Sequence, residues 1–192
     1  MINPMKWVEH QIKNHWTLFS LALMVLTAVW IAGTALFTQP MIGRQDQQPR
    51  PGFYAPDFEL LTPQRDAIRL QDLRGRPVIL NLWTSWCPRC KTEMVSLEKL
   101  HRQFQADGLV VLAVNMTYQD NVQSAIQFLD DHDLTFPVVL DVDGWVGQLY
   151  QVRALPTTFF IDRSGRIHSM ELGGPLPEAL LQAKAIQLLE DE

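Results

Sequence analysis

The chain holds only two cysteines in 192 residues, Cys87 and Cys90, and they lie in a Trp-Cys-Pro-Arg-Cys run. The preceding residues, 78–83, are apolar and β-prone, which predicts a buried strand. Residues 91–104 carry apolar side chains at helical spacing, and Pro88 suits the first turn of a helix because its missing N–H costs nothing there. This pattern places Cys87 at a helix N-terminus, where unpaired N–H groups favour an anion.

That position favours nucleophilic sulfur chemistry. The thiolate is the attacking form of cysteine, and its ordinary pKa of ~8.5 falls at a helix N-terminus or beside a cation. Arg89 is a candidate cation, and the alternative is that its side chain simply points to solvent. We predict that Cys87 attacks a substrate disulfide and that Cys90, one turn further on and more buried, resolves the mixed disulfide.

Two static interpretations of the cysteine pair compete with this one. A permanent bridge across two residues constrains little chain entropy. A structural zinc site needs about four ligands, and the sequence offers no second Cys or Cys/His pair. We therefore expect a redox-active Cys87–Cys90 disulfide and neither a metal nor a cofactor.

The motif and its surroundings resemble the thioredoxin superfamily, and within it the membrane-anchored TlpA/ResA-like group, close to the redoxins. Residues 81–94 and 154–162 carry the resemblance. Segments 70–77 and 111–115 agree with it, and in total it covers about 52–189. It implies an α/β thioredoxin fold, with a mixed central sheet flanked by helices, and a thiol-disulfide oxidoreductase activity.

The resemblance also implies roles for residues around the cysteines. Pro156 is expected to be a cis proline that faces them, with Leu155 before it in contact with substrate. A cis X-Pro bond costs little more than trans, and proline offers no N–H to a strand ladder. Trp86 is expected to shape the thiol pocket, and Pro88 with Arg89 to tune the redox potential.

A proton acceptor for Cys90 is harder to identify. Thioredoxins carry a buried aspartate where this chain has Asn81, and an amide cannot take up a proton. The nearest acidic residues are Glu93, which we expect on a solvated helix face, and Asp120, which we expect to cap the helix beginning near Asn121. We assign no base from the sequence.

The N-terminal region predicts a membrane anchor. After a short segment, 1–16, residues 17–37 are uncharged and mostly apolar. About 20 such residues span a bilayer core as a helix. We expect an uncleaved transmembrane signal anchor. A cleavable signal peptide is the alternative, although its apolar core is usually shorter, about 7–15 residues.

The orientation of this anchor rests on the resemblance. Lys6 and Lys13 precede it and Arg44 and Arg50 follow it, so the positive-inside rule is nearly balanced. The TlpA/ResA-like resemblance favours a single-pass protein of the bacterial cytoplasmic membrane, with its catalytic domain on the extracytoplasmic, periplasmic side.

Two further regions follow the anchor. Residues 38–56 are rich in Pro, Gln and Gly and predict a flexible tether, and 57–192 form the thioredoxin-like domain. Strands and helices alternate in this domain, which predicts a mixed sheet. The expected elements are an N-terminal hairpin (58–61, 67–70), the strand 109–115, a central βα insertion within 118–141 (helix 121–132, strand 137–141), a short helix (146–150), a hairpin (157–162, 167–172) and a final helix (177–189).

Charge and motifs then limit the partners. The net charge of −5 argues against nucleic acid. We expect protein thiol and disulfide substrates and a membrane electron donor for an extracytoplasmic reductase, with cytochrome c maturation as one role known in the family. Two alternatives stay open. A thiol peroxidase is suggested by Thr84, three residues before Cys87, although Leu80 replaces the proline of peroxiredoxins. A non-catalytic module could bind copper through both cysteines.

Overall fold

The computed structural model describes residues 23–28, 30 and 46–190. The chain divides into two compact units, Met1–Ile42 and Gly43–Glu192. In the first, residues 23–28 and 30 are helical, and the predicted anchor over 17–37 otherwise lies outside the described residues. Within the described part, no helix combines the length and the apolar character that crossing a bilayer requires.

The second unit is built on one seven-stranded mixed sheet, with the strand order β2-β1-β5-β4-β3-β6-β7. At its centre, β3 (Val78–Trp83) runs parallel to β4 (Val110–Asn115) and antiparallel to β6 (Thr157–Ile161). Beyond these lie β5 (Val138–Leu140), parallel to β4, and β7 (Ile167–Leu172), antiparallel to β6. β1 (Glu59–Leu61) and β2 (Ala67–Arg69) form the predicted N-terminal hairpin.

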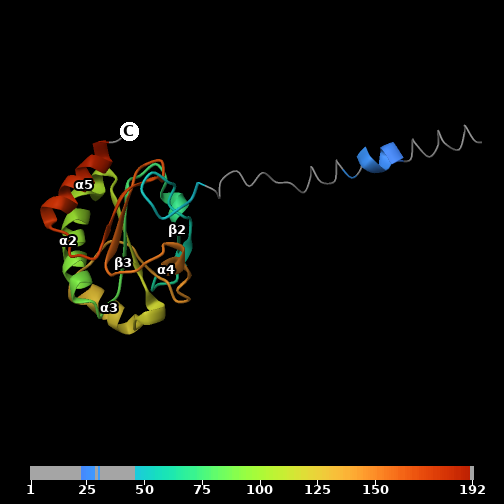
Figure 1. Ribbon diagram of the computed structural model, residues 1–192. Helices are drawn as coiled ribbons and strands as arrows, with labels where there is room; N and C mark the ends of the chain where they lie inside the picture. Colours follow the sequence, from blue (N-terminus) through green and yellow to red (C-terminus); the bar gives the residue numbers. More distant parts are fainter. Residues whose placement is uncertain (1–22, 29, 31–45, 191–192) are drawn as a thin grey trace, which may run out of the picture. The chain divides into compact units, whose positions relative to one another are not determined.

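Helices cover both faces of the sheet (Figure 1), as predicted. On one face, α2 (Pro88–Phe104), α3 (Val122–Asp131) and α5 (Glu178–Glu190) pack on Ile79 and Trp83. On the other, α4 (Trp145–Leu149) packs on Leu80 and Leu82. Side chains alternate between faces along a strand, so β3 is apolar throughout because it is buried on both sides. Three short 3-10 helices complete the fold: η1 (Leu70–Leu73), η2 (Gln105–Asp107) and η3 (Thr117–Gln119).

The described part of the expected tether, residues 46–56, is folded rather than free. The Gly52 N–H donates to the Ile167 carbonyl and the Ile167 N–H donates to the Phe53 carbonyl, both at 2.8 Å. The Arg166 guanidinium lies 4.1 Å from the centre of the Tyr54 ring. Composition indicates a tether because proline and glutamine dominate, whereas these backbone bonds to the first residue of β7 depend on the tertiary fold. Residues 38–45 lie outside the described part.

The central βα unit follows the prediction. Asn121 is the N-cap of α3, and its side chain accepts a hydrogen bond from the Ser124 N–H at 2.9 Å. The strand that follows, β5, enters the sheet between β1 and β4.

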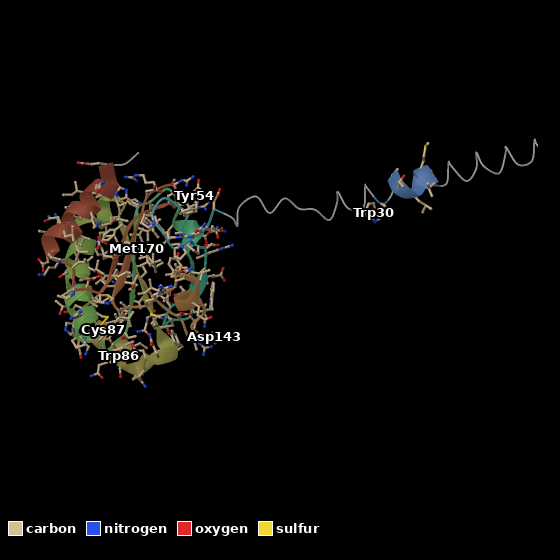
Figure 2. The ribbon with its side chains drawn as sticks, viewed as in Figure 1. Trp30, Tyr54, Trp86, Cys87, Asp143 and Met170 are labelled. Carbon is tan, nitrogen blue, oxygen red and sulfur yellow. A yellow bond between two sulfur atoms is a disulfide. The ribbon has the colours of Figure 1, made fainter. Side chains whose placement is uncertain are left out.

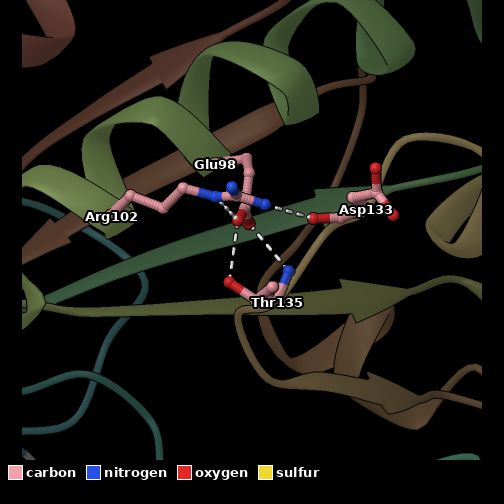
Figure 3. A network of polar contacts seen from close by, with 4 residues as sticks. All are labelled: Glu98, Arg102, Asp133 and Thr135. Carbon is pink, nitrogen blue, oxygen red and sulfur yellow. Dashed lines mark hydrogen bonds and ion pairs between the residues drawn. The ribbon is translucent and has the colours of Figure 1, made fainter.

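A buried carboxylate fastens this unit to α2 (Figure 3). Glu98 accepts from the Thr135 N–H at 2.8 Å, from the Thr135 hydroxyl at 2.7 Å and from the Arg102 side chain at 2.5 Å. Arg102 also donates to the Asp133 carbonyl at 2.8 Å. Burial by itself would raise the pKa of Glu98, but the bonds from Thr135 and Arg102 together outweigh it and lower the pKa below its ordinary value.

We predict that Glu98→Gln lowers the free energy of unfolding at pH 7 by about 2 kcal/mol, because one of these donors is left facing an NH₂ group. A lowered folded pKa means that this stabilisation is present above the ordinary carboxyl pKa and is lost as the pH falls through the folded value. Urea unfolding of the wild type and of Glu98→Gln should therefore show a difference in the free energy of unfolding that narrows from pH 7 towards pH 3. A difference independent of pH would contradict the role of the ionised carboxylate.

Candidate active site

The two cysteines occupy the end of β3 and the start of α2. Cys87 is the N-cap of α2, and its Sγ accepts a hydrogen bond from the Cys90 N–H at 3.2 Å. Pro88 takes the first helical position, as predicted. The helix therefore directs an N–H and its positive end at the Cys87 sulfur, which stabilises a thiolate there.

The cysteines form a disulfide and differ in accessibility. The bond joins Cys87 and Cys90, whose Cα atoms are 5.2 Å apart, so the structure shows the oxidised state. Cys87 keeps 6% of its surface exposed, and Cys90 is completely buried. A substrate can thus reach only the first sulfur directly, and Cys90 is the more buried of the two, as predicted.

A groove opens in front of Cys87. We call it the thiol groove; its volume is about 340 Å³, and its lining includes Trp86, Cys87, Tyr118 and Leu155. The Trp86 indole N–H donates to the Gln119 carbonyl at 2.9 Å, and Trp86 is 59% exposed. Trp86 and Leu155 therefore lie where the resemblance expected them, beside the reactive sulfur.

For Arg89 the structure favours the solvent-exposed alternative. It is exposed, and among the described residues it makes no hydrogen bond or ion pair. The described polar support for a thiolate at Cys87 comes from the helix N-terminus, through the Cys90 N–H.

The Leu155–Pro156 peptide bond is cis, as the resemblance implied. The Pro156 carbonyl accepts the Gly173 N–H at 2.8 Å. A second cis bond joins Gly174 to Pro175, which the sequence analysis missed. The two segments are close together, since a Cβ atom on Gly174 would lie 2.7 Å from Cγ of Pro156 and would collide with the Glu93 carboxylate.

The expectation that Glu93 lies on a solvated face is wrong. Glu93 is only 1% exposed. Its Oε1 accepts from the Asn81 amide at 3.0 Å and from the Thr158 hydroxyl at 2.5 Å, and its Oε2 accepts from the Leu176 N–H at 2.9 Å. One helical turn after Cys90, it shares that residue's helix face.

This arrangement explains the asparagine that replaces the thioredoxin aspartate. Asn81 binds the carboxylate that α2 supplies, so an acidic group is buried here after all. The usable signal in the sequence was Asn81 itself, because a buried amide within an apolar strand requires polar partners.

Asp120 also differs from the prediction, because Asn121 and not Asp120 caps α3. The Asp120 carboxylate accepts from the Ser85 N–H at 2.5 Å, the Ser85 hydroxyl at 2.6 Å and the Asn115 amide at 2.7 Å. Burial raises the pKa of Asp120, but the bonds from Ser85 and its neighbours together lower it below its ordinary value. Asp120 thus connects Ser85, which follows β3 and directly precedes Trp86, to Asn115 at the end of β4.

Within the described part of the chain, no three His, Cys, Asp or Glu side chains group as a metal site would require. The features described for the site are two sulfurs, a groove and a buried carboxylate. A mixed sheet whose central strand leads into a helix capped by one cysteine of a disulfide pair defines the class of thioredoxin-like thiol-disulfide oxidoreductases.

Comparison with known proteins gives the family. Residues 51–170 match the AhpC/TSA family, and the chain belongs to it. The sequence is 40% identical over 123 residues to the thioredoxin-like protein YneN of Bacillus subtilis, covering 64% of this chain and 71% of that protein. It is 31% identical over 150 residues to the thiol-disulfide oxidoreductase ResA of the same organism, covering 78% and 82%.

Solved structures agree with this assignment and show that the fold is thioredoxin-like. StoA from Bacillus subtilis superimposes with a TM-score of 0.59 at 28% identity, covering 67% of this chain and 96% of that one. A Chlorobium tepidum protein described as a DsbE-type thiol:disulfide interchange protein gives a TM-score of 0.67 at 28% identity, covering 74% and 99%.

Proposed function

We propose that this protein is a thiol-disulfide oxidoreductase that reduces disulfides of other proteins through Cys87 and Cys90. The observation that supports it best is Cys87, whose sulfur caps α2 and which lines the thiol groove, while Cys90 is completely buried. The names of the relatives, thiol-disulfide oxidoreductase and thiol:disulfide interchange protein, agree with this activity.

The proposed cycle begins with the reduced pair. The Cys87 thiolate attacks one sulfur of a substrate disulfide; that S–S bond breaks, a substrate thiolate leaves, and a mixed disulfide with Cys87 forms. The Cys90 thiol then loses its proton, attacks Cys87 Sγ and releases the second substrate thiolate. Two electrons have passed to the substrate, and the Cys87–Cys90 disulfide of the structure remains. A dithiol donor reduces it again.

Glu93 is the proposed acceptor for the Cys90 proton. It is a buried carboxylate one turn from Cys90, and its hydrogen-bond donors, Asn81, Thr158 and Leu176, hold it in place. Since Cys90 has no exposed surface, an internal acceptor provides a shorter route for this proton than bulk water does.

The reaction can be tested in single turnover. Prereduced protein mixed with glutathione disulfide or insulin should form the Cys87–Cys90 bond while one substrate disulfide is reduced per chain, followed by thiol counting and mass spectrometry. A protein that reacts at least tenfold faster with hydrogen peroxide than with either disulfide would instead be a thiol peroxidase. A protein that binds Cu(I) but exchanges no disulfide would be the copper-binding module.

We further propose that residues 17–37 anchor the protein in the cytoplasmic membrane with the catalytic domain on the extracytoplasmic side, where a membrane dithiol protein supplies electrons and apocytochromes c are one candidate substrate. The uncharged stretch supports the anchor, and the family resemblance supports the orientation.

We predict that the full chain sediments with membranes after carbonate washing and that deletion of residues 1–42 releases an active domain into the soluble fraction. External protease should cleave the domain in spheroplasts, with a cytoplasmic protein as the protected control. Full-length protein that stays in the soluble fraction would contradict the anchor, and protection from protease would contradict the orientation.

A further inference from the structure

Large apolar side chains are exposed at the end of the sheet where β3 leads to Cys87. Trp86, Tyr118 and Trp145 are 59%, 51% and 41% exposed, and Val142 and Leu61 are exposed as well. We call these five residues the aromatic band. Contiguous exposed apolar surface on a soluble domain is typical of a binding surface.

The band begins at the reactive sulfur. Trp86 and Tyr118 both line the thiol groove with Cys87. The bond from the Trp86 indole to the Gln119 carbonyl connects the two aromatic residues through the backbone next to Tyr118.

Tyr118 extends the band towards α4. Its N–H donates to the Asp141 carbonyl at 3.1 Å, and its ring lies against Gly144, where a Cβ atom would come within 2.9 Å of two ring carbons. Gly144 also has a φ of +72°, so both the close ring contact and the backbone favour glycine. The ring thus lies on the turn that leads into Trp145.

Beyond this turn lies a second groove, with a volume of about 500 Å³, lined by Leu61, Leu140, Val142 and Trp145 among others. It forms where β1 and β5 pair through a single position, Leu61 with Leu140. Figure 2 shows Asp143, from the lining of this groove, at the same lower end of the domain as Trp86 and Cys87.

We propose that the aromatic band binds an unfolded stretch of the substrate polypeptide, with an aromatic or large aliphatic substrate side chain seated in the second groove. This inference rests on the proposed function. The occupant follows from continuity: the substrate must bond covalently to Cys87, and the band starts in the groove that contains Cys87. Because Cys87 is only 6% exposed, an extended chain enters the groove more readily than a folded surface does.

The strand order sets the spacing of the two substrate residues. A substrate peptide that runs from Cys87 to the second groove passes from the end of β3 to the end of β1. It crosses three strand spacings. At about 4.8 Å each this is roughly 14 Å, which an extended peptide covers in about four or five residues. The preferred apolar residue therefore lies about four to five positions from the substrate cysteine.

The test uses 15-residue Gly/Ser/Lys peptides with a central cysteine in mixed disulfide with glutathione. One set carries phenylalanine at four or five positions before or after the cysteine, and the reference peptide carries glycine there. Single-turnover rates with prereduced protein should be about five- to tenfold higher for the best phenylalanine peptide than for the reference. The ratio of these two rates should fall to about 1 in Trp145→Ser. Val142→Ser is a second variant at a more exposed site, and the ratio should fall to about 1 there as well.

Ile186→Ser on α5 is the matched control, since Ile186 is as exposed as Trp145, at 41%, and lies outside the band. It should keep the wild-type ratio. A ratio of phenylalanine to reference rates near 1 in the wild type would overturn the inference, and so would a ratio unchanged in both band variants. A dimer that Val142→Ser dissociates without changing this ratio would also overturn it. Failure of the proposed function is distinct, because the wild type would then reduce neither the peptides nor glutathione disulfide.

Discussion

Replacement of Cys87 by serine should lower the rate of disulfide reduction at least about a thousandfold, because a hydroxyl does not ionise at neutral pH and cannot replace the thiolate. Cys87 is the only sulfur of the pair that a substrate can reach, since Cys90 is completely buried. The measurement is single-turnover reduction of insulin or glutathione disulfide by prereduced protein.

Cys90→Ser is the informative companion to this variant. It keeps the attacking sulfur and removes the resolving one, so mixed disulfides between Cys87 and substrate should accumulate and be visible on non-reducing gels. The stability of both variants should be compared with the reduced wild type, because the oxidised form carries an additional crosslink. Wild-type turnover by Cys87→Ser protein would refute the assignment of the nucleophile.

The second large effect concerns Glu93. We expect Glu93→Gln to slow the release of substrate from the mixed disulfide about a hundredfold at pH 7, since the Cys90 proton loses its acceptor. Formation of the mixed disulfide should change less than about threefold, because Cys87 takes its stabilisation from the N-terminus of α2. Quench-flow separation of the two steps measures both rates.

The pH dependence distinguishes proton uptake from a mere loss of stability. In Glu93→Gln protein the deficit should narrow at alkaline pH, because hydroxide then takes up the thiol proton in place of the carboxylate. Glu98→Gln is the matched control, because Glu98 is a second buried, hydrogen-bonded glutamate on the same helix. It should lose stability without blocking substrate release. Equal defects in both variants would contradict the role of Glu93.

Local patterns in the sequence were sufficient for the reactive sulfur and its scaffold. The apolar run of β3, the helical spacing of α2 and Pro88 at the first helical position together place Cys87 at the N-cap. Each of these signals depends on neighbours along the chain, so it can be read without knowledge of the tertiary fold.

The residues that the sequence misplaced depend on partners distant in the chain. Glu93 is buried because Thr158 and Leu176, 65 and 83 residues away, donate to it. Asp120 bonds to Ser85 across 35 residues. A charged residue on a helix is most often solvated, and only the tertiary fold brings these donors together.

The second groove was equally beyond local analysis. Val142 and Trp145 lie between the predicted strand 137–141 and the predicted helix 146–150, and nothing in their spacing indicates that Leu61, about eighty residues earlier, lies opposite them. Their role emerges only from the position of β1 in the sheet, next to β5.

The folding of residues 46–56 onto the β6–β7 turn has a practical consequence. Tyr54, which is part of this segment, lies at the opposite end of the domain from Cys87 (Figure 2). A bead, electrode or fusion tag attached just ahead of Asp46 therefore leaves the thiols facing open solution. Protein immobilised in this way should keep its full capacity for repeated reduction and oxidation of the cysteine pair.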